Sequence, residues 1–381
     1  MPLRAIHLTT PNRIHEVNRQ FGVNVPAAWL DNLLFEWRVA DKEQILALKY
    51  WLAQNEHRVL KVDAEQGMLL FKLGELTDEP VSRPLPPALQ EEWTRIGFFL
   101  QHNALPPWQW GEGRTLYFDR GPIIMGILNV TPDSFSDGGK FFDVSAAVER
   151  ALRMAEEGAQ IIDVGGESTR PGAEPVPLDE ELRRVLPVIE ALRQKSDILI
   201  SIDTYKSEVA RQALQAGADI VNDISGARFD ENMPRVVARF AVPLIIMHIK
   251  GMPKNMQKNP HYSDVIEEIY SYFEERLNFL QEQGIKHLAI DPGIGFGKRL
   301  EDNLKLLRDL KDFTFLNRPI LMGTSRKSFI GQILDKEVDE RLFGSLATQV
   351  IAVQNGAHLL RVHDVAATND ALKIWQAIAG I

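Results

Sequence analysis

Short apolar runs alternate with amphipathic segments from about residue 121 to the end of the chain. Helical patterns separate the runs, such as one that begins near Asp143 or Ser145 and one around Val265–Tyr270. The eight runs lie near residues 123–130, 161–166, 198–203, 220–225, 242–248, 288–293, 320–326 and 359–364. Repeated βα units predict a parallel sheet, and eight of them predict an α/β fold of the TIM (β/α)8 barrel type.

The first hundred residues follow a different pattern. Strands are predicted over Leu33–Val39, Arg58–Val62 and Met68–Leu73, and helices over Lys42–Gln54 and Pro87–Gln101. Six of the seven tryptophans precede residue 111, and the Pro- and Gly-containing stretch 106–113 predicts a linker. We therefore expect a small α+β domain of unknown role over residues 1–108 and the barrel over residues 109–381.

Composition narrows the class of protein. The chain of 381 residues is 45% hydrophobic and 25% charged, which is typical of a globular protein. No apolar run approaches the ~18 residues that a membrane span requires, and the amino terminus lacks a secretory signal pattern, so a cytoplasmic protein without a membrane partner is expected. The absence of cysteine excludes disulfides and thiolate metal sites. The net charge of -9 argues against a nucleic-acid partner.

Polar motifs follow the predicted strands. In the stretch from Gly126 to Gly139, the first apolar strand runs into a polar loop that ends in glycine. Similar junctions follow at Asp163–Gly172, Ser201–Thr204, Asn222–Gly226, Asp291–Lys298, Ser325–Ser328 and Arg361–Asp364. In a barrel these junctions share the carboxyl-terminal face, where barrel enzymes have their active sites.

With these motifs in order, residues 114 to about 380 resemble the dihydropteroate synthase family. The resemblance implies a transferase of folate biosynthesis that joins 6-hydroxymethyl-7,8-dihydropterin diphosphate to 4-aminobenzoate and releases pyrophosphate. It also implies inhibition by sulfonamides, small-molecule substrates as the binding partners, and a homodimer formed through barrel helices.

A pterin is a flat ring with a polar edge, so its pocket needs donors and acceptors on rigid strand ends. Asp291 can accept from two adjacent N–H groups, and Asn222 offers both a donor and an acceptor. The resemblance implies that the pterin is bound by Asp203, Asn222, Met247, Asp291 and Lys327.

A second group is suited to phosphate, because arginine presents a planar fork to phosphate oxygens and histidine adds a donor. These residues belong to the first, second and eighth predicted strands, which meet in a closed barrel. The resemblance implies that pyrophosphate is held by Asn129, Ser168, Thr169, Arg170, Arg361 and His363. It also implies Mg²⁺ as cofactor, with Asn129 as a ligand.

The aryl amine requires a third group. The resemblance implies that 4-aminobenzoate is bound by Phe135, Thr169, Pro171, Phe296 and Ser328. The amide groups of the helix that begins near Ser328 are suited to its carboxylate. The residues expected to take part in catalysis are Asp203, Lys327, Arg361, His363 and Asp137. Arg361 and His363 would offset charge on the leaving group, and Asp203 or Asp137 would stabilise positive charge on the pterin.

Other interpretations fit some of these residues. A lone Asp at a βα junction is commonly an N-cap, and His363 could be a structural histidine. A methyltetrahydrofolate-dependent methyltransferase shares the barrel and similar Asp and Asn residues, but needs no pyrophosphate cluster. A non-catalytic pterin-binding homologue would have lost some of these groups. A Schiff-base aldolase would use Lys327, with Arg326 lowering the pKa of its amine.

Overall fold

The computed structural model describes residues 3–74, 85, 87–101, 105–130, 143–170 and 172–380. Contacts between residues divide the chain into two compact units. Unit 1 comprises Met1–Asn103 together with Lys311–Asn317, and unit 2 comprises Ala104–Leu310 and Arg318–Ile381. Among the described residues, no helix has the length and apolar character needed to cross a membrane.

Unit 1 contains a four-stranded antiparallel sheet with the strand order β1-β2-β4-β3. Its strands are β1 (Leu3–His7), β2 (Leu33–Arg38), β3 (Arg58–Asp63) and β4 (Met68–Lys72). Its helices are α1 (Pro11–Phe21), η1 (Ala27–Trp29), α2 (Lys42–Gln54) and α3 (Pro87–Gln101). The sequence predicted β2, β3, β4, α2 and α3. We did not predict β1 and α1. The Thr10-Pro11 pair at the start of α1 is a recognisable helix start signal, because Thr10 is a good N-cap and Pro11 suits the first turn. In the structure Thr10 Oγ1 accepts the N–H of Arg13 at 3.1 Å.

The short segment Lys311–Asn317 completes the core of unit 1. Phe313 and Phe315 are buried, and the rings of Phe315 and Phe35 lie 5.7 Å apart. Asp312 is also buried, where its carboxylate accepts from Arg13 Nη2 at 2.6 Å and from the backbone N–H of His7 at 2.7 Å. All of this segment except Asn317 lies in η2 (Leu310–Leu316), which connects a helix and a strand of the barrel in chain order.

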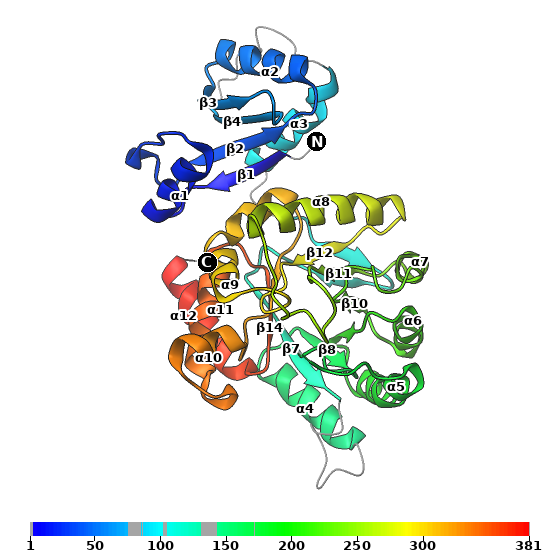
Figure 1. Cartoon of the computed structure of the whole chain (residues 1–381). Helices are drawn as coiled ribbons and strands as arrows, with labels where there is room; N and C mark the ends of the chain where they lie inside the picture. Colours follow the sequence, from blue (N-terminus) through cyan, green and yellow to red (C-terminus); the bar gives the residue numbers. More distant parts are fainter. Residues whose placement is uncertain are drawn as a thin grey trace. The chain divides into compact units, whose positions relative to one another are not determined.

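Unit 2 is the predicted TIM barrel (Figure 1). Eight parallel strands follow the order β12-β11-β10-β9-β8-β7-β14-β13, and a parallel bridge between Ile290 and Ile320 joins the two ends of that series. The strands are β7 (Ile123–Asn129), β8 (Ile161–Gly165), β9 (Leu199–Asp203), β10 (Ile220–Asp223), β11 (Leu244–Met247), β12 (Leu288–Asp291), β13 (Leu321–Met322) and β14 (Leu359–Val362). The predicted fold class is therefore confirmed.

Helices surround the strands of unit 2 (Figure 1). They include α4 (Val144–Glu156), α5 (Leu178–Lys195), α6 (Ser207–Ala216), α7 (Met233–Phe240), α8 (Val265–Glu282), α9 (Leu300–Arg308), α10 (Ser328–Leu334), η3 (Val338–Glu340), α11 (Leu342–Gln354) and α12 (Val365–Ala379). Of the two N-caps proposed for α4, Asp143 is the one observed, since its carboxylate accepts from the N–H groups of Ser145 and Ala146.

A hairpin closes the amino-terminal end of the barrel. Its strands are β5 (Trp108–Trp110) and β6 (Arg114–Leu116). Trp108 and Trp110 belong to one buried cluster with the residues that begin five of the barrel strands: Ile123, Ile161, Ile220, Leu321 and Leu359. The interpretation of 106–113 as a linker was wrong, because two large indole rings are buried here. The opposite, carboxyl-terminal end of the barrel is where the polar strand ends lie.

Candidate active site

The register of the parallel strands brings several predicted residues to one level. Asn129 pairs with Gly165, Gly165 with Asp203, and Asp203 with Asn222 across β7, β8, β9 and β10. On β11 and β12, Met247 pairs with Asp291. Because these residues lie at or next to the carboxyl ends of their strands, they share the carboxyl-terminal face.

Arg361 of β14 is at the centre of this face. Its Nε donates to Asp163 Oδ2 and its Nη2 to Asp203 Oδ2, each at 2.6 Å. Asn222 Nδ2 also donates to Asp163 Oδ2, at 3.2 Å. Asp203, Asn222 and Arg361, taken from three separate motifs, are thus brought together.

Asp163 was given no role from the sequence, although it opens one of the polar motifs. It is fully buried within β8, between Ile162 and Val164. A carboxylate inside an apolar strand requires a partner, because burial of an unpaired charge is costly. That rule was the signal that could have identified Asp163.

The centre has two carboxylates for one guanidinium. Within the described part of the chain, Asp163 Oδ1 and Asp203 Oδ1 are buried and have no hydrogen-bond partner. Burial raises the pKa of Asp203 to about 7; Arg361 opposes this shift, and the charge of Asp163 adds to it. The arrangement therefore suits a ligand that brings N–H donors or positive charge.

Asp291 lies buried on the neighbouring side of the face. Its Oδ1 accepts the N–H of Gly293 at 2.7 Å. Burial raises the pKa of Asp291, while this hydrogen bond and nearby cations act against the rise. Gly293 has φ +74°, and a Cβ there would lie 2.0 Å from the carbonyl oxygen of His248, so only glycine allows this close approach.

Lys327 extends over Phe296, with its Nζ 4.2 Å from the ring centroid. Burial lowers the pKa of Lys327 to about 8, an effect that Asp291 opposes and that Arg361 and Arg170 reinforce. Arg326, which the sequence suggested as the group that lowers this pKa, instead donates to Asp364 at 2.7 and 3.0 Å. Lys327 and Asp291 are close enough for their charges to influence each other.

The other residues predicted to hold pyrophosphate lie in separate parts of the chain and differ in burial. The imidazole Nδ1 of His363 lies 3.0 Å from Ser325 Oγ, and burial lowers the pKa of His363 to about 4, so its ring is neutral at pH 7. Ser168 and Arg170 are exposed and Thr169 is half-buried in the loop after β8, and Asn129 is half-buried. The remaining predicted residues, Phe135, Asp137 and Pro171, lie outside the described residues.

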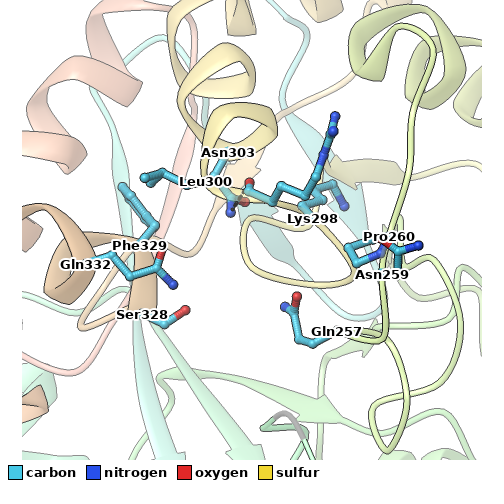
Figure 2. Close-up of a pocket in the computed structure, with 10 residues that line it drawn as sticks. Gln257, Asn259, Pro260, Lys298, Leu300, Asn303, Ser328, Phe329 and Gln332 are labelled. Atoms are coloured by element: carbon cyan, nitrogen blue, oxygen red, sulfur yellow. Dashed lines mark hydrogen bonds between the residues drawn. The ribbon is translucent and has the colours of Figure 1, made fainter.

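A cavity of about 350 Å³ lies between α10 and the loops that follow β11 and β12 (Figure 2). Figure 2 shows Ser328 and Gln332 of α10 on one side and Gln257 and Asn259 on the other. Gln257 Nε2 donates to the carbonyl oxygen of Gly295 at 2.6 Å. Of the predicted site residues, only Ser328 lines this cavity among the described residues, and the carboxylates of the centre do not.

Comparisons with known proteins agree with this geometry. Residues 125–363 match the family described as pterin binding enzyme. A dihydropteroate synthase of Haemophilus influenzae is 50% identical over 260 residues, which cover 68% of this chain and 94% of that relative. Such a relative therefore consists almost wholly of the part that matches the barrel.

Solved structures give the same result. A Yersinia pestis dihydropteroate synthase in complex with a sulfonamide drug has a TM-score of 0.69 and 42% identity, and the match covers 72% of this chain and all of that one. A Xanthomonas albilineans dihydropteroate synthase with 4-aminobenzoic acid has a TM-score of 0.68 and 47% identity, covering 73% and 100% of the two chains. The chain thus belongs to the pterin binding enzyme family and, within that family, to the dihydropteroate synthases.

Proposed function

We propose that the chain carries out its synthase reaction at the centre formed by Asp203, Asn222, Asp291, Lys327 and Arg361. The activity is that of a dihydropteroate synthase, a transferase that condenses the pterin diphosphate with 4-aminobenzoate. The observation that supports this placement best is that Arg361 binds the two buried carboxylates of Asp163 and Asp203. The other oxygen of each carboxylate has no hydrogen-bond donor in the described part of the chain.

In this proposal the pterin lies against Met247 with its N–H groups on Asp291 and its remaining polar edge on Asn222 and Lys327. The amine nitrogen of 4-aminobenzoate attacks the exocyclic CH₂ of the pterin, the C–O bond to diphosphate breaks, and the amine loses one proton. Aryl amines are neutral at pH 7, so the leaving group is the main difficulty. Arg361 and His363 stabilise the charge that develops on it, together with Ser168, Thr169 and Arg170.

Positive charge spreads over the pterin as pyrophosphate leaves. Asp203 is suited to stabilise this charge, because it is buried and one of its oxygens is available in the described structure. Asp137 keeps its place as a second candidate. Asp203 must be ionised for this role, and burial raises its pKa to about 7, so the rate should fall as the pH drops below neutrality.

We propose Mg²⁺ as the cofactor, with Asn129 as one ligand. Among the described residues, no cluster of three His, Cys, Asp or Glu could hold a metal ion. A single amide oxygen fits a hard cation that takes its remaining ligands from water and substrate phosphate. Bound there, Mg²⁺ would neutralise charge on the pyrophosphate.

For 4-aminobenzoate we propose a site formed by Thr169, Phe296 and Ser328, with Phe135 and Pro171 from outside the described residues. The supporting observations are the cavity next to Ser328 and the complex of the Xanthomonas albilineans relative with 4-aminobenzoic acid. We propose that sulfonamides, one of which is bound by the Yersinia pestis relative, compete for the same site.

A comparison of two variants tests whether Asp291 binds the pterin ring and His363 binds the diphosphate. Asp291→Asn should weaken binding of both the pterin diphosphate and a phosphate-free pterin, by about 1.5–3 kcal/mol, because charge-assisted hydrogen bonds are lost. His363→Ala should weaken only the diphosphate. Calorimetric titration measures both, and pyrophosphate release dependent on 4-aminobenzoate and Mg²⁺ measures turnover. Equal losses of phosphate-free pterin binding in the two variants would show that the division is wrong.

We also propose a homodimer through the last barrel helices. The described residues of α10, α11 and α12 expose large apolar side chains: Ile333, Leu334, Phe343, Ile351, Ile374 and Ile378. The helix α11 contacts both α10 and α12, and exposed apolar surface of this kind is typical of an interface. Phe343 is 75% exposed, so Phe343→Glu should give a monomer by light scattering, while the control Phe279→Glu on α8 should not. An unchanged molar mass for Phe343→Glu would contradict this interface.

A further inference from the structure

Lys298 is a buried lysine that the proposed chemistry does not use. It is 3% exposed, and its Nζ lies 3.0 Å from His248 Nδ1, 3.2 Å from the carbonyl oxygen of His248 and 3.0 Å from that of Phe296. Burial of an amine is costly, and here all three of its hydrogen-bonding directions are occupied by protein atoms. His248 likewise has no duty in the proposed reaction.

Lys298 joins two segments that each carry residues of the proposed substrate sites. His248 follows Met247 at the end of β11, and its N–H donates to the carbonyl oxygen of Asp291 at 3.0 Å. Phe296 lies in the loop after β12 and carries Lys327 over its ring. Lys298 therefore fastens the end of one pterin-site strand to the loop that follows the next.

The backbone shows how closely these segments approach. A Cβ on Gly293 would lie 2.0 Å from the carbonyl oxygen of His248, and one on Gly297 would lie 2.4 Å from that of Lys250. Glycine makes the approach possible, but glycine by itself provides no attraction. The hydrogen bonds of Lys298 supply that attraction.

We infer that Lys298 is a positioning residue of the pterin site, which holds the loop after β12 against the end of β11 and places a positive charge near Asp291. The inference rests on the proposed role of Asp291 as the acceptor for pterin N–H groups. An ionised carboxylate is needed for that role, because a protonated one has lost part of its acceptor capacity.

The surrounding charges define what Lys298 contributes. The cations that face Asp291 are Lys327, Lys298 and Arg361, and all three act against the rise in pKa that burial causes. Lys298 itself faces Asp291, Asp302, Lys327 and Lys250, besides His248.

Burial lowers the pKa of Lys298 to about 7, with Asp291 and Asp302 opposing the shift. Its positive charge is therefore present below neutrality, where it favours the ionised form of Asp291. As the pH rises above 7 this charge is lost, and with it the effect of Lys298 on Asp291.

The test uses the full chain with Lys298→Met, which removes the charge and keeps a similar volume. Carbon-13 NMR of aspartate labelled at its carboxyl carbon follows the titration of Asp291, whose signal is assigned by its loss in Asp291→Asn. We expect the midpoint of Asp291 to rise by about one pH unit or more in Lys298→Met. Binding of a phosphate-free pterin should weaken at pH 6 by about tenfold and recover as the pH rises.

Lys298→Gln is the second variant, because it keeps N–H donors while removing the charge, and it should show the same shift with a smaller loss of stability. Lys258→Met, at an exposed lysine of the loop after β11, is the charge-matched control and should leave the midpoint unchanged. An unchanged midpoint of Asp291 in either Lys298 variant would overturn the inference. So would failure of both variants to fold, since Lys298 would then serve stability alone.

The same data separate this inference from the proposed function. If Asp291→Asn bound the phosphate-free pterin as tightly as the unchanged protein, the assignment of Asp291 would fail. If Asp291→Asn lost binding while the Lys298 variants titrated normally, only the inference about Lys298 would fail.

Discussion

Replacing Arg361 by methionine is expected to reduce turnover by at least about 10²-fold and to destabilise the barrel by about 3–5 kcal/mol. The guanidinium makes 2.6 Å hydrogen bonds to both Asp163 and Asp203, and both carboxylates are buried. Its removal leaves two buried carboxylates without their shared cation. Turnover falls for a separate reason, because the donor proposed for the leaving group is lost. Pyrophosphate release and urea denaturation measure the two effects.

The loss of stability in Arg361→Met should depend on pH. Burial already raises the pKa of Asp203 to about 7, and loss of Arg361 raises it further. A folded-state pKa above the unfolded value means that the native state binds more protons, so stability falls as pH rises through that range. The difference from the unchanged protein should therefore be larger at about pH 8 than at about pH 5.

A double variant separates stability from chemistry. Asp163→Asn combined with Arg361→Met removes one of the two unpaired charges, so it should recover part of the lost stability and none of the lost turnover. If the single variant Arg361→Met were as stable as the unchanged protein at pH 8, Arg361 would not be the cation that stabilises the two buried carboxylates.

The parts of the fold that could be predicted are those with strong local patterns. All eight barrel strands were located, but several were predicted too long at their carboxyl ends; β12, for example, ends at Asp291 and not at residue 293. The apolar pattern continues into residues such as Ile224 and Ile294, which are buried in loops and not in strands. Buried apolar residues in the loops at the carboxyl face of a barrel thus look, in the sequence, like a continuation of the strand.

The parts that were missed depend on contacts distant in sequence. Asp163 lies 198 positions from Arg361, so only the closed barrel shows why a carboxylate is tolerated inside β8. Prolines precede the hairpin of β5 and β6 and glycines lie in its turn, a composition that indicates a linker. Its tryptophans nevertheless pack with the first residues of barrel strands. Lys298 ends one of the polar motifs, but its burial against His248 could not be inferred from spacing.

Removing residues 1–103 is expected to give a chain that aggregates although it retains the whole barrel. Several dihydropteroate synthases consist almost wholly of the matching part, which supports our proposal that the barrel alone carries the synthase activity. In this chain, however, Lys311–Asn317 packs in the core of unit 1, and the deletion would expose Phe313 and Phe315. Each exposed ring loses about 1.5–3 kcal/mol of burial and becomes a site of association.

Substitution of these two phenylalanines tests that explanation. The substitution should help the truncated chain and harm the full chain. In the truncated chain, Phe313→Ser with Phe315→Ser should restore solubility and most of the turnover, since the rings have no core left to fill. In the full chain the same pair should destabilise unit 1 by at least about 3–5 kcal/mol, because each large core side chain is lost. Light scattering, pyrophosphate release and thermal unfolding measure these results. A repaired truncation that is folded and soluble but inactive would instead assign unit 1 a part in the reaction, because solubility would then no longer limit the barrel.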